Sequence, residues 1–500
     1  MTVIVQDPGT PGWGRELLEE SVYSLPYRLV KSPDVLVIGV GGGTEIDAAL
    51  HWGARSVTGV EISLVTLRAL TGPYASFAGW PERKDTVRVV HQDGRSFAKS
   101  TGRRFDVVQM TGVDTLTMHS SGAMALAEDY LYTREAFVDF LGLLEPGGVL
   151  AVNRFGSEGS SLAAIAIAAL GKTGASRPED HVAVVRQAQL SGVVVKREPL
   201  TEADRSALAR IGSRTAPSGV LIPHYDAVGV SLGAPMELVE GHGDASIAVP
   251  TDDRPYYMLG SWLAALGGKR SGRTGVPRLV ILYSCVPATA AIIVLLLPAA
   301  LVRRRTGAGA AAMAAVVAYF GALGAGYMLM EMALMHRMVV LVGTPGAAVA
   351  VVLASLLVSS GAGAFSTDRG AIGTRARIGI AIAGIAILGT LHALGGPILE
   401  HAFGLPAWAR AAVAALSIAP LGFFMGWLFP EGLRSVSRRW PAAVPWAIAV
   451  NGLASVIGSL AVLPLSVVTG FRIVFVIAIG VYAAGALAMI AVARNHPSAS

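Results

Sequence analysis

The sequence predicts an α/β domain with a Rossmann-like parallel sheet, followed by an all-α, polytopic transmembrane domain. Residues 34–155 alternate short apolar strands with helical segments, a pattern typical of parallel strands joined by helices. From residue 279 onward, apolar runs recur that are long enough to cross the roughly 30 Å core of a bilayer. Hydrophobic residues make up 53% of the 500-residue chain, so part of it is expected to lie in lipid.

The elements of the α/β domain follow from apolar runs that end in glycine, proline or polar residues. Strands are expected at Val35–Val40, Ser56–Ile62, Thr86–His91, Phe105–Met110 and Gly148–Phe155. Helices are expected between them, at about 44–52, 63–70, 94–99 and 134–145. After these come a hairpin at His181–Gln187 and Gly192–Lys196 and a charged helix at Thr201–Ser213.

The chain divides into an α/β domain at 1–265, a polar linker at 266–278 and a membrane domain at 279–494. Seven apolar runs are expected to span the bilayer, at 279–302, 308–330, 345–366, 378–396, 408–429, 444–467 and 471–493. An additional crossing or re-entrant segment at Gly326–Gly343 is an open alternative. The lipid bilayer is therefore an expected partner.

The charge is divided unequally between the two halves. From residue 279 onward the chain has 13 Arg, no Lys and 4 acidic residues, whereas the preceding part has 27 basic and 30 acidic residues. The basic excess thus lies where loop arginines set topology. The α/β half lacks the basic patch that nucleic acids require, so no nucleic-acid partner is expected. The single cysteine, Cys285, excludes disulfides within the chain and any cysteine-based metal site, and no metal is expected.

The side of the membrane that the α/β domain faces stays open at this point. With seven spans, the loops on its own side hold seven basic residues and the opposite loops hold ten, which favours a location outside the cytoplasm. The polar start Met1–Trp13 has no secretory signal, so a cytoplasmic location of the α/β domain is the default. We therefore expect a multi-pass protein of the cell inner (plasma) membrane with a cytoplasmic α/β domain.

A glycine-rich turn is the main functional signal. The run 34–46 joins an apolar strand to a helix through Gly39, Gly41 and Gly43, whose missing side chains would let backbone approach a nucleoside cofactor. Glu61 ends the next strand, where it is placed to accept hydrogen bonds from ribose hydroxyls. A nicotinamide dinucleotide site uses the same arrangement. The next strand ends in Asp93 and Gly94, which favour a class I S-adenosylmethionine (SAM) domain, where such an Asp binds the adenine amino group.

Several stretches together resemble the transmembrane spermidine synthase-like proteins, often described as a spermidine synthase-like domain fused to a transporter-like half. In the α/β half these stretches are Leu25–Leu29, Val37–Glu45, Val60–Glu61, Asp93–Arg95, Phe105–Gln109, Glu128–Thr133 and Pro250–Tyr257. In the membrane half they are Gly326–Glu331, Met425–Pro430 and Trp446–Gly452.

The resemblance implies transfer of an alkyl group from SAM or decarboxylated SAM to a small-molecule acceptor, either a polyamine or a membrane-associated compound. A homo-oligomer is also compatible with this resemblance. At two positions this sequence departs from the pattern of the soluble aminopropyltransferases. Gly42 stands where an Asp binds the amine of decarboxylated SAM, and Thr111 stands where an Asp deprotonates the attacking amine. Because a threonine is a poor base, methyl and aminopropyl transfer are both retained.

The acceptor side is expected to involve Asp114, Glu128 and Tyr130 as catalytic residues, with Asp129 and Tyr132 beside them. These residues follow the carboxyl ends of the strands, where doubly wound folds bind ligands. The run Asp252-Asp253-Arg254 either closes the site or forms a turn held by its own Asp–Arg contact.

A function from another class also fits the sequence: a transporter or exporter whose α/β domain senses SAM or a polyamine without turnover. Thr111, in place of the expected base, is the feature that favours it. In the membrane half, Glu331, His336 and Arg337 interrupt apolar sequence. Ionisable groups in lipid often mark a site, and contacts between helices are the alternative.

Overall fold

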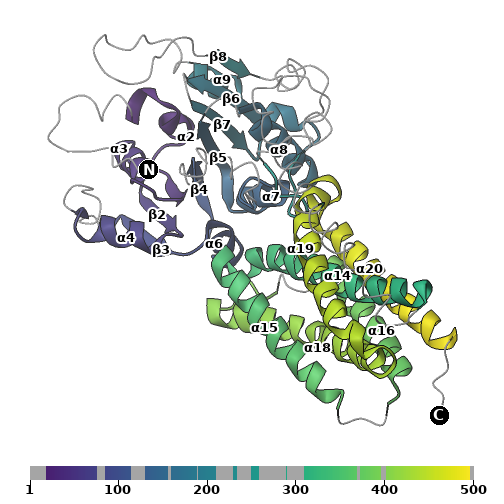
Figure 1. Ribbon diagram of the computed structural model, residues 1–500. Helices are drawn as coiled ribbons and strands as arrows, with labels where there is room; N and C mark the ends of the chain where they lie inside the picture. The colour runs from purple at the N-terminus through teal and green to yellow at the C-terminus, as the bar shows by residue number, and fades with distance from the viewer. Residues whose placement is uncertain are drawn as a thin grey trace. The chain divides into compact units, whose positions relative to one another are not determined.

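The computed structural model describes residues 18–75, 85–113, 130–155, 159–187, 190–209, 229–232, 249–257, 289, 309–368, 372–395 and 401–495 (Figure 1). The chain forms two compact units, Met1–Arg273 and Thr274–Ser500. The division between them falls inside the linker expected at 266–278. Each unit is described by itself.

The first unit is built on one eight-stranded sheet with the order β3-β2-β1-β4-β5-β7-β6-β8. Its strands are β1 (Asp34–Ile38), β2 (Ser56–Glu61), β3 (Val87–His91), β4 (Phe105–Thr111), β5 (Leu144–Phe155), β6 (Val182–Gln187), β7 (Leu190–Lys196) and β8 (Gly229–Leu232). The first five strands are parallel, and the last three join antiparallel beyond β5. The expected Rossmann-like α/β fold is confirmed.

Helices cover both faces of this sheet. They are the 3-10 helix η1 (Val22–Ser24), α2 (Leu25–Leu29), α3 (Thr44–His51), α4 (Leu64–Thr71), α6 (Gly94–Ser100), α7 (Arg134–Gly142), α8 (Gly159–Lys172), the 3-10 helix η5 (Pro178–His181) and α9 (Glu202–Ala209). Strand β1 shows why both faces are apolar. Leu36 and Ile38 pack in the core with α6, α7 and α8, whereas Val35 and Val37 pack in the core with α2, α3 and α4. Parallel strands covered on both sides need such continuous hydrophobic runs.

One boundary differs from expectation. Helix α7 ends at Gly142, and β5 already begins at Leu144, although the sequence predicted a helix to 145 and a strand only from Gly148. The reason is a pairing that local sequence does not show. Phe105 donates its N–H to the Leu143 carbonyl at 2.8 Å, and the ladder then shifts register between Phe105 and Val107. This irregular pairing draws the segment around Pro146 into the start of β5, between β4 and β7.

The direction in which the chain adds strands reverses between β1 and β4. The chain runs outward from β1 through β2 to β3, then returns to the other side of β1 as β4. At this reversal the helices that follow β1 and β4 cover opposite faces of the sheet, and doubly wound folds bind ligands at such a point, beside the carboxyl ends of the strands. The glycine turn after β1 and residues 111–113 at the end of β4 lie there.

The second unit is all-α. Its described elements are α14 (Ala310–Val342), α15 (Pro345–Ser366), α16 (Thr374–Leu394), α18 (Ala407–Arg439), the 3-10 helix η7 (Pro441–Ala443), α19 (Val444–Thr469) and α20 (Phe471–Asn495). Six helices in the described part of the chain are long and apolar enough to cross a membrane. The span expected at 279–302 lies outside the described residues. Gly326 to Val342 belong to the single helix α14, so this stretch forms neither a separate crossing nor a re-entrant segment.

Close backbone approaches hold these helices together. Helix α14 packs against α19 and α20, and α15 packs against α18. A methyl group added at Gly324 would collide with the carbonyl of Asn451, and one at Gly363 with the carbonyl of Phe423. The Asn451 side chain donates to the Phe320 carbonyl at 3.2 Å, a hydrogen bond between α19 and α14. Small residues are needed where membrane helices meet this closely.

The polar residues of α14 make contacts within the second unit. Glu331 hydrogen-bonds Tyr327, one turn earlier in the same helix. His336 stacks on Phe471 with ring centroids 4.4 Å apart, and Arg337 donates to the Ala393 carbonyl at 3.2 Å. The contacts of His336 and Arg337 join helices, as the structural alternative expects, whereas the contact of Glu331 lies within α14.

A buried ion cluster joins the ends of α15, α16 and α18. Arg377 Nη1 donates to Glu431 Oε1 at 2.5 Å and to the Thr367 carbonyl at 2.6 Å. Arg434 Nη1 donates to the same Glu431 oxygen at 2.9 Å, and its Nη2 pairs with Asp368. Glu431 is only 1% exposed, so its charge depends on these two arginines.

Candidate cofactor and acceptor site

The glycine turn after β1 has the backbone geometry that the sequence predicted. Gly39, Gly41 and Gly43 all have positive φ, at 77°, 51° and 93°. Gly39 donates its N–H to the Val60 carbonyl at 2.8 Å, and Gly43 caps the start of α3. A side chain at Gly39 would collide with Val113, whereas nothing lies within 4 Å of a methyl group added at Gly41. The turn is therefore tight on one side and open at Gly41.

Glu61 is held in place by backbone donors at the carboxyl end of β2. Its Oε2 accepts from the Gly41 N–H at 3.0 Å, and its Oε1 accepts from the Ser63 N–H at 2.7 Å. The side chain is buried, and no cation pairs with it in the described part of the chain. A carboxylate has about four acceptor positions. Each oxygen therefore keeps one position for a neutral donor such as a hydroxyl.

Asp93 and Gly94 end β3 and begin α6. Asp93 Oδ1 accepts from the Ser96 N–H at 2.8 Å and so caps the helix. Gly94 is needed for close packing, because a methyl group there would collide with Ile38 of β1. Asp93 thus has a structural role in α6, and its second carboxylate oxygen is not used by that cap.

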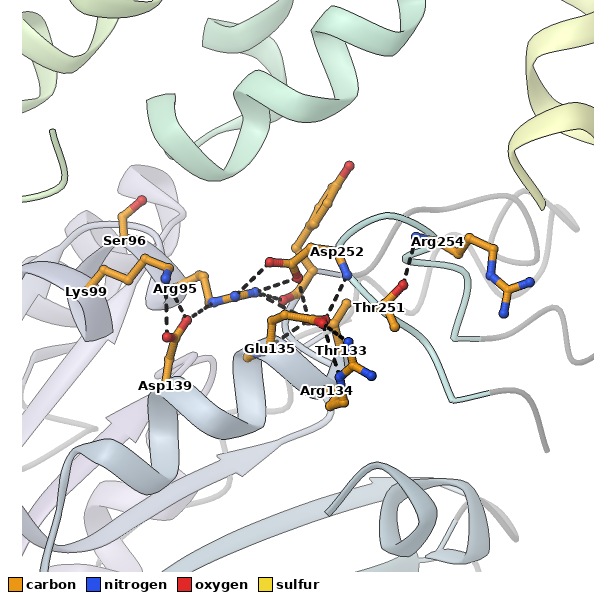
Figure 2. Close-up of polar contacts among 12 residues, drawn as sticks. Arg95, Ser96, Lys99, Thr133, Arg134, Glu135, Asp139, Thr251, Asp252 and Arg254 are labelled. Carbon is orange, nitrogen blue, oxygen red and sulfur yellow. Dashed lines mark hydrogen bonds and ion pairs between the residues drawn. The ribbon is translucent and has the colours of Figure 1, made fainter. Parts of the chain in front are cut away.

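Arg95 forms a buried hub directly behind this helix start, as Figure 2 shows. Its side chain is 2% exposed. Nε donates to Asp139 at 2.5 Å, Nη1 to the Tyr130 carbonyl at 2.9 Å and to Asp252 at 3.0 Å, and Nη2 to Asp252 at 2.9 Å. Burial alone would lower the pKa of Arg95, but the charges of Asp252 and Asp139 outweigh it and raise the pKa. The arginine therefore stays charged and holds three separate segments.

The segment 249–257 is attached to the sheet domain through this hub. Asp252 also accepts from the Thr133 hydroxyl at 2.7 Å, and its backbone N–H donates to Glu135 at 3.0 Å. The turn itself is closed by Thr251 and Arg254 through two backbone hydrogen bonds of 3.2 and 2.8 Å. The sequence left open an Asp–Arg contact within the turn. The structure pairs Asp252 with Arg95, and within the turn the Thr251 hydroxyl accepts from the Arg254 N–H at 3.3 Å.

A stacked group lies next to this segment. The rings of Tyr132 and Tyr257 are 5.0 Å apart, and the Arg154 guanidinium lies over both, at 4.3 and 4.8 Å from their centroids. Tyr132 is fully buried, so it shapes the core beneath the site. Tyr130 is half-buried, and its carbonyl accepts from Arg95. Tyr130 thus lies four residues before the start of α7, in contact with the Arg95 side chain.

The other acceptor-side residues fall outside the described part of the chain. These are Asp114, Glu128 and Asp129, which follow β4 or precede α7. Thr111 to Val113 are described and half-buried at the end of β4. Within the described residues, no group of three or more metal-ligating side chains occurs.

Sequence reasoning missed three groups near this edge. In the sequence Arg95 stands out only as a neighbour of Asp93, and no sequence pattern marks Glu45 or Asn153 as a site residue. Glu45, in the first turn of α3, is buried, and burial raises its pKa to about 7 despite a hydrogen bond from Thr111. Asn153 Nδ2 donates to the Thr111 hydroxyl at 3.0 Å. The only available signal was an acid directly after a glycine turn, which is ordinarily read as a favourable charge at a helix start.

Several solved structures resemble part of this chain in fold, at low sequence identity. No family model and no curated protein matches this chain. Among solved structures, spermidine synthase from Thermotoga maritima is 16% identical with a TM-score of 0.28, covering 38% of this chain and 61% of that one. The CcbJ methyltransferase from Streptomyces caelestis is 25% identical with a TM-score of 0.21, covering 31% and 54%.

A further similar structure is an S-adenosylmethionine-dependent methyltransferase from Clostridium acetobutylicum, 18% identical with a TM-score of 0.20, covering 30% of this chain and 52% of that one. This chain therefore matches less than two thirds of the length of each. The chemistry of the site is accordingly derived from its own residues.

Proposed function

We propose that the N-terminal unit binds SAM or decarboxylated SAM and transfers its methyl or aminopropyl group to a nucleophile, within an integral membrane protein. The observation that carries this proposal is how Glu61 is buried and hydrogen-bonded. A buried carboxylate held by two backbone N–H groups, with one acceptor position left on each oxygen, suits the two hydroxyls of a ribose.

The surrounding residues fit the rest of such a molecule. The open face at Gly41 leaves room for backbone to lie against the sugar and the amino-acid part. Asp93, just beyond the end of the next strand, supplies a carboxylate, and a carboxylate suits an adenine amino group. When bound, the sulfonium supplies an electrophilic carbon next to a good thioether leaving group. The chain's own task is then to hold that carbon in line with the acceptor.

The acceptor is proposed to be a polyamine or a small molecule associated with the membrane. It would approach over Thr111 and Tyr130, with Asp114 and Glu128 as the acids that bind it. The six long apolar helices in the described part of the chain support an acceptor associated with the membrane. No observation specifies which group is transferred, so both donors are retained.

Cofactor binding is tested with the full-length protein in lipid nanodiscs. Calorimetric titration with SAM and, separately, decarboxylated SAM should show binding by the wild type and none by Glu61→Ala. Glu202→Ala, on the exposed face of α9, is the matched control and should bind as the wild type does. Retained binding by Glu61→Ala would sink the assignment of the ribose site.

Turnover is tested separately from binding. Radiolabelled SAM or decarboxylated SAM is incubated with the protein and either putrescine or a native lipid extract, and labelled products are separated. Label transfer supports the enzyme. Binding of the donor with no transfer to any acceptor would favour the sensing domain of a transporter instead.

We further propose that the first unit faces the cytoplasm from the inner membrane, because the donor is a cytoplasmic metabolite. A protease-sensitive tag at the N-terminus should resist protease in intact spheroplasts and be cut after permeabilisation. Cleavage in intact spheroplasts would overturn this orientation.

A further inference from the structure

The end of β4 carries a short chain of hydrogen bonds that leads from the site edge into the protein. Asn153 Nδ2, at the end of β5, donates to Thr111 Oγ1 at 3.0 Å. Thr111 in turn hydrogen-bonds the carboxylate of Glu45. Because the hydroxyl oxygen already accepts from Asn153, its single proton is directed at Glu45.

Glu45 lies at the buried end of this chain. It is 6% exposed, in the first turn of α3, while Thr111 is half-buried at the strand end. The ionisable groups around it are Tyr23 of η1, Tyr27 of α2 and Asp47 of α3. Burial, and then the charge of Glu45, raises the pKa of both tyrosines, so they stay neutral. Among the described residues no basic side chain pairs with Glu45. Only hydrogen bonds from its own backbone and from Thr111 favour the charged form of this carboxyl, and burial outweighs them.

The same loop touches the glycine turn. The side chain of Val113 lies where a side chain at Gly39 would be, and Gly112 donates its N–H to the Asn153 carbonyl at 3.0 Å. Thr111 is thus fixed beside the turn that would hold the donor. Its hydroxyl is the part of the chain that an acceptor at this edge could reach.

We propose that Glu45 accepts, through the Thr111 hydroxyl, the proton that the attacking nitrogen must lose. This inference rests on the proposed transfer function and adds a proton acceptor to it. It also answers the objection that a threonine cannot act as a base. The base is then Glu45, whose carboxylate accepts a hydrogen bond from Thr111 at the strand end.

The step balances in atoms and charge. The amine nitrogen forms a bond to the donor carbon while the carbon–sulfur bond breaks, and the sulfur leaves as a neutral thioether with the electron pair. The positive charge moves from sulfur to nitrogen. The new ammonium gives a proton to Thr111 Oγ1 as the threonine proton passes to Glu45, which becomes a neutral acid. Exchange with water restores the carboxylate.

The test uses full-length protein in nanodiscs, with SAM or decarboxylated SAM as donor and putrescine or phosphatidylethanolamine as acceptor. Glu45→Gln and Thr111→Val are compared with Thr111→Ser, which keeps the hydroxyl, and with Glu202→Gln as a control. Donor affinity should stay within about threefold of the wild type in all four. Transfer should fall by roughly 100-fold or more in the first two variants, and Thr111→Ser should retain most of it.

The pH profile separates a proton acceptor from a structural group. Wild-type kcat/KM should rise with pH up to about 7, where the Glu45 carboxyl ionises, and Glu45→Gln should lack that rise. Infrared difference spectra give a readout without turnover. A carboxyl that titrates near pH 7 should be present in the wild type, absent in Glu45→Gln and shifted in Thr111→Val.

Each failure has its own signature. A wild type that binds neither donor contradicts the proposed function. A binding wild type in which Glu45→Gln transfers normally, or in which no carboxyl near pH 7 is lost, overturns the role of Glu45 alone. Donor binding that is lost in Glu45→Gln also overturns it, because the carboxylate would then hold the donor's ammonium.

Discussion

Arg95 and Asp252 lie 157 residues apart in the chain and form an ion pair through two hydrogen bonds, Nη1 to Oδ1 at 3.0 Å and Nη2 to Oδ2 at 2.9 Å. The pair ties the start of α6 to the segment 249–257. Arg95 is nearly inaccessible, whereas the Asp252 side chain is 32% exposed. The charge of Arg95 holds the pKa of Asp252 below its ordinary value, although burial alone would raise it.

Replacing Asp252 with Asn should loosen this attachment. The amide keeps the shape but leaves Arg95 buried with Asp139 as its only carboxylate partner. We expect a cost of about 2 kcal/mol, below the 3–5 typical of fully buried pairs, because Asp252 is partly exposed. Hydrogen exchange of the amides in 251–257 should then be roughly thirtyfold faster. Asp85→Asn, at an exposed site, is the control, and equal exchange in the two variants would contradict the anchoring role.

Glu45→Gln should change how stability depends on pH. The folded-state pKa of Glu45, about 7, lies above its ordinary value of 4.5, so the folded protein binds this proton more tightly than the unfolded chain does. The carboxyl therefore lowers stability progressively as pH rises from 4.5 to about 7, by about 3 kcal/mol at most. Native-state exchange of the β1 amides at pH 5 and pH 8 should show Glu45→Gln gaining protection over the wild type only at the higher pH. A constant difference would argue against an ionised, buried Glu45.

Gly39→Ala and Gly53→Ala form a matched pair. Both glycines have φ near +78°, so both substitutions carry the same conformational cost of about 1–2 kcal/mol. Only at Gly39 does the added methyl group also collide with Val113, since Gly53 has nothing within 4 Å. Gly39→Ala should therefore lose donor binding in calorimetry, and Gly53→Ala should keep it. Equal effects would mean that the turn does not contact the donor.

Arg377→Gln should destabilise the membrane unit far more than Arg438→Gln. Arg377 shares the buried carboxylate of Glu431 with Arg434, whereas Arg438 is exposed at the same helix end. We expect a cost of about 3 kcal/mol for the first change and less than about 0.5 kcal/mol for the second. Thermal unfolding in nanodiscs of one lipid composition measures the difference. Indistinguishable midpoints would show that Arg434 alone satisfies Glu431.

The elements of both units could be predicted where a local pattern is sufficient. Continuous apolar runs between turn residues located β1 to β4 within one or two residues at each end. Long apolar runs located α15 and α20 equally well. Helix α14 extends beyond the predicted run at 308–330, because Glu331, His336 and Arg337 interrupt the apolar sequence on which the prediction relied. The helix continues through them because each has a partner, respectively Tyr327, Phe471 and Ala393.

The geometry of the glycine turn and of Glu61 was also predictable, because it depends on short-range contacts. A strand, a turn that requires positive φ at Gly39, Gly41 and Gly43, and an acid at the end of the next strand are all visible as sequence. Their meeting point follows from parallel neighbours in one sheet. That Glu61 is held by the N–H groups of Gly41 and Ser63 follows from the same local arrangement.

The sequence by itself thus determined the α/β fold, the apolar membrane half and the glycine turn with Glu61. Only the tertiary structure decided the partners of Arg95, the buried state of Glu45 and its link through Thr111 to Asn153. The physical reason is that burial and charge pairing depend on which distant strands and helices meet. A carboxylate after a glycine turn reads as an ordinary helix-start acid until α3 packs against the end of β4, where water is excluded and its pKa rises.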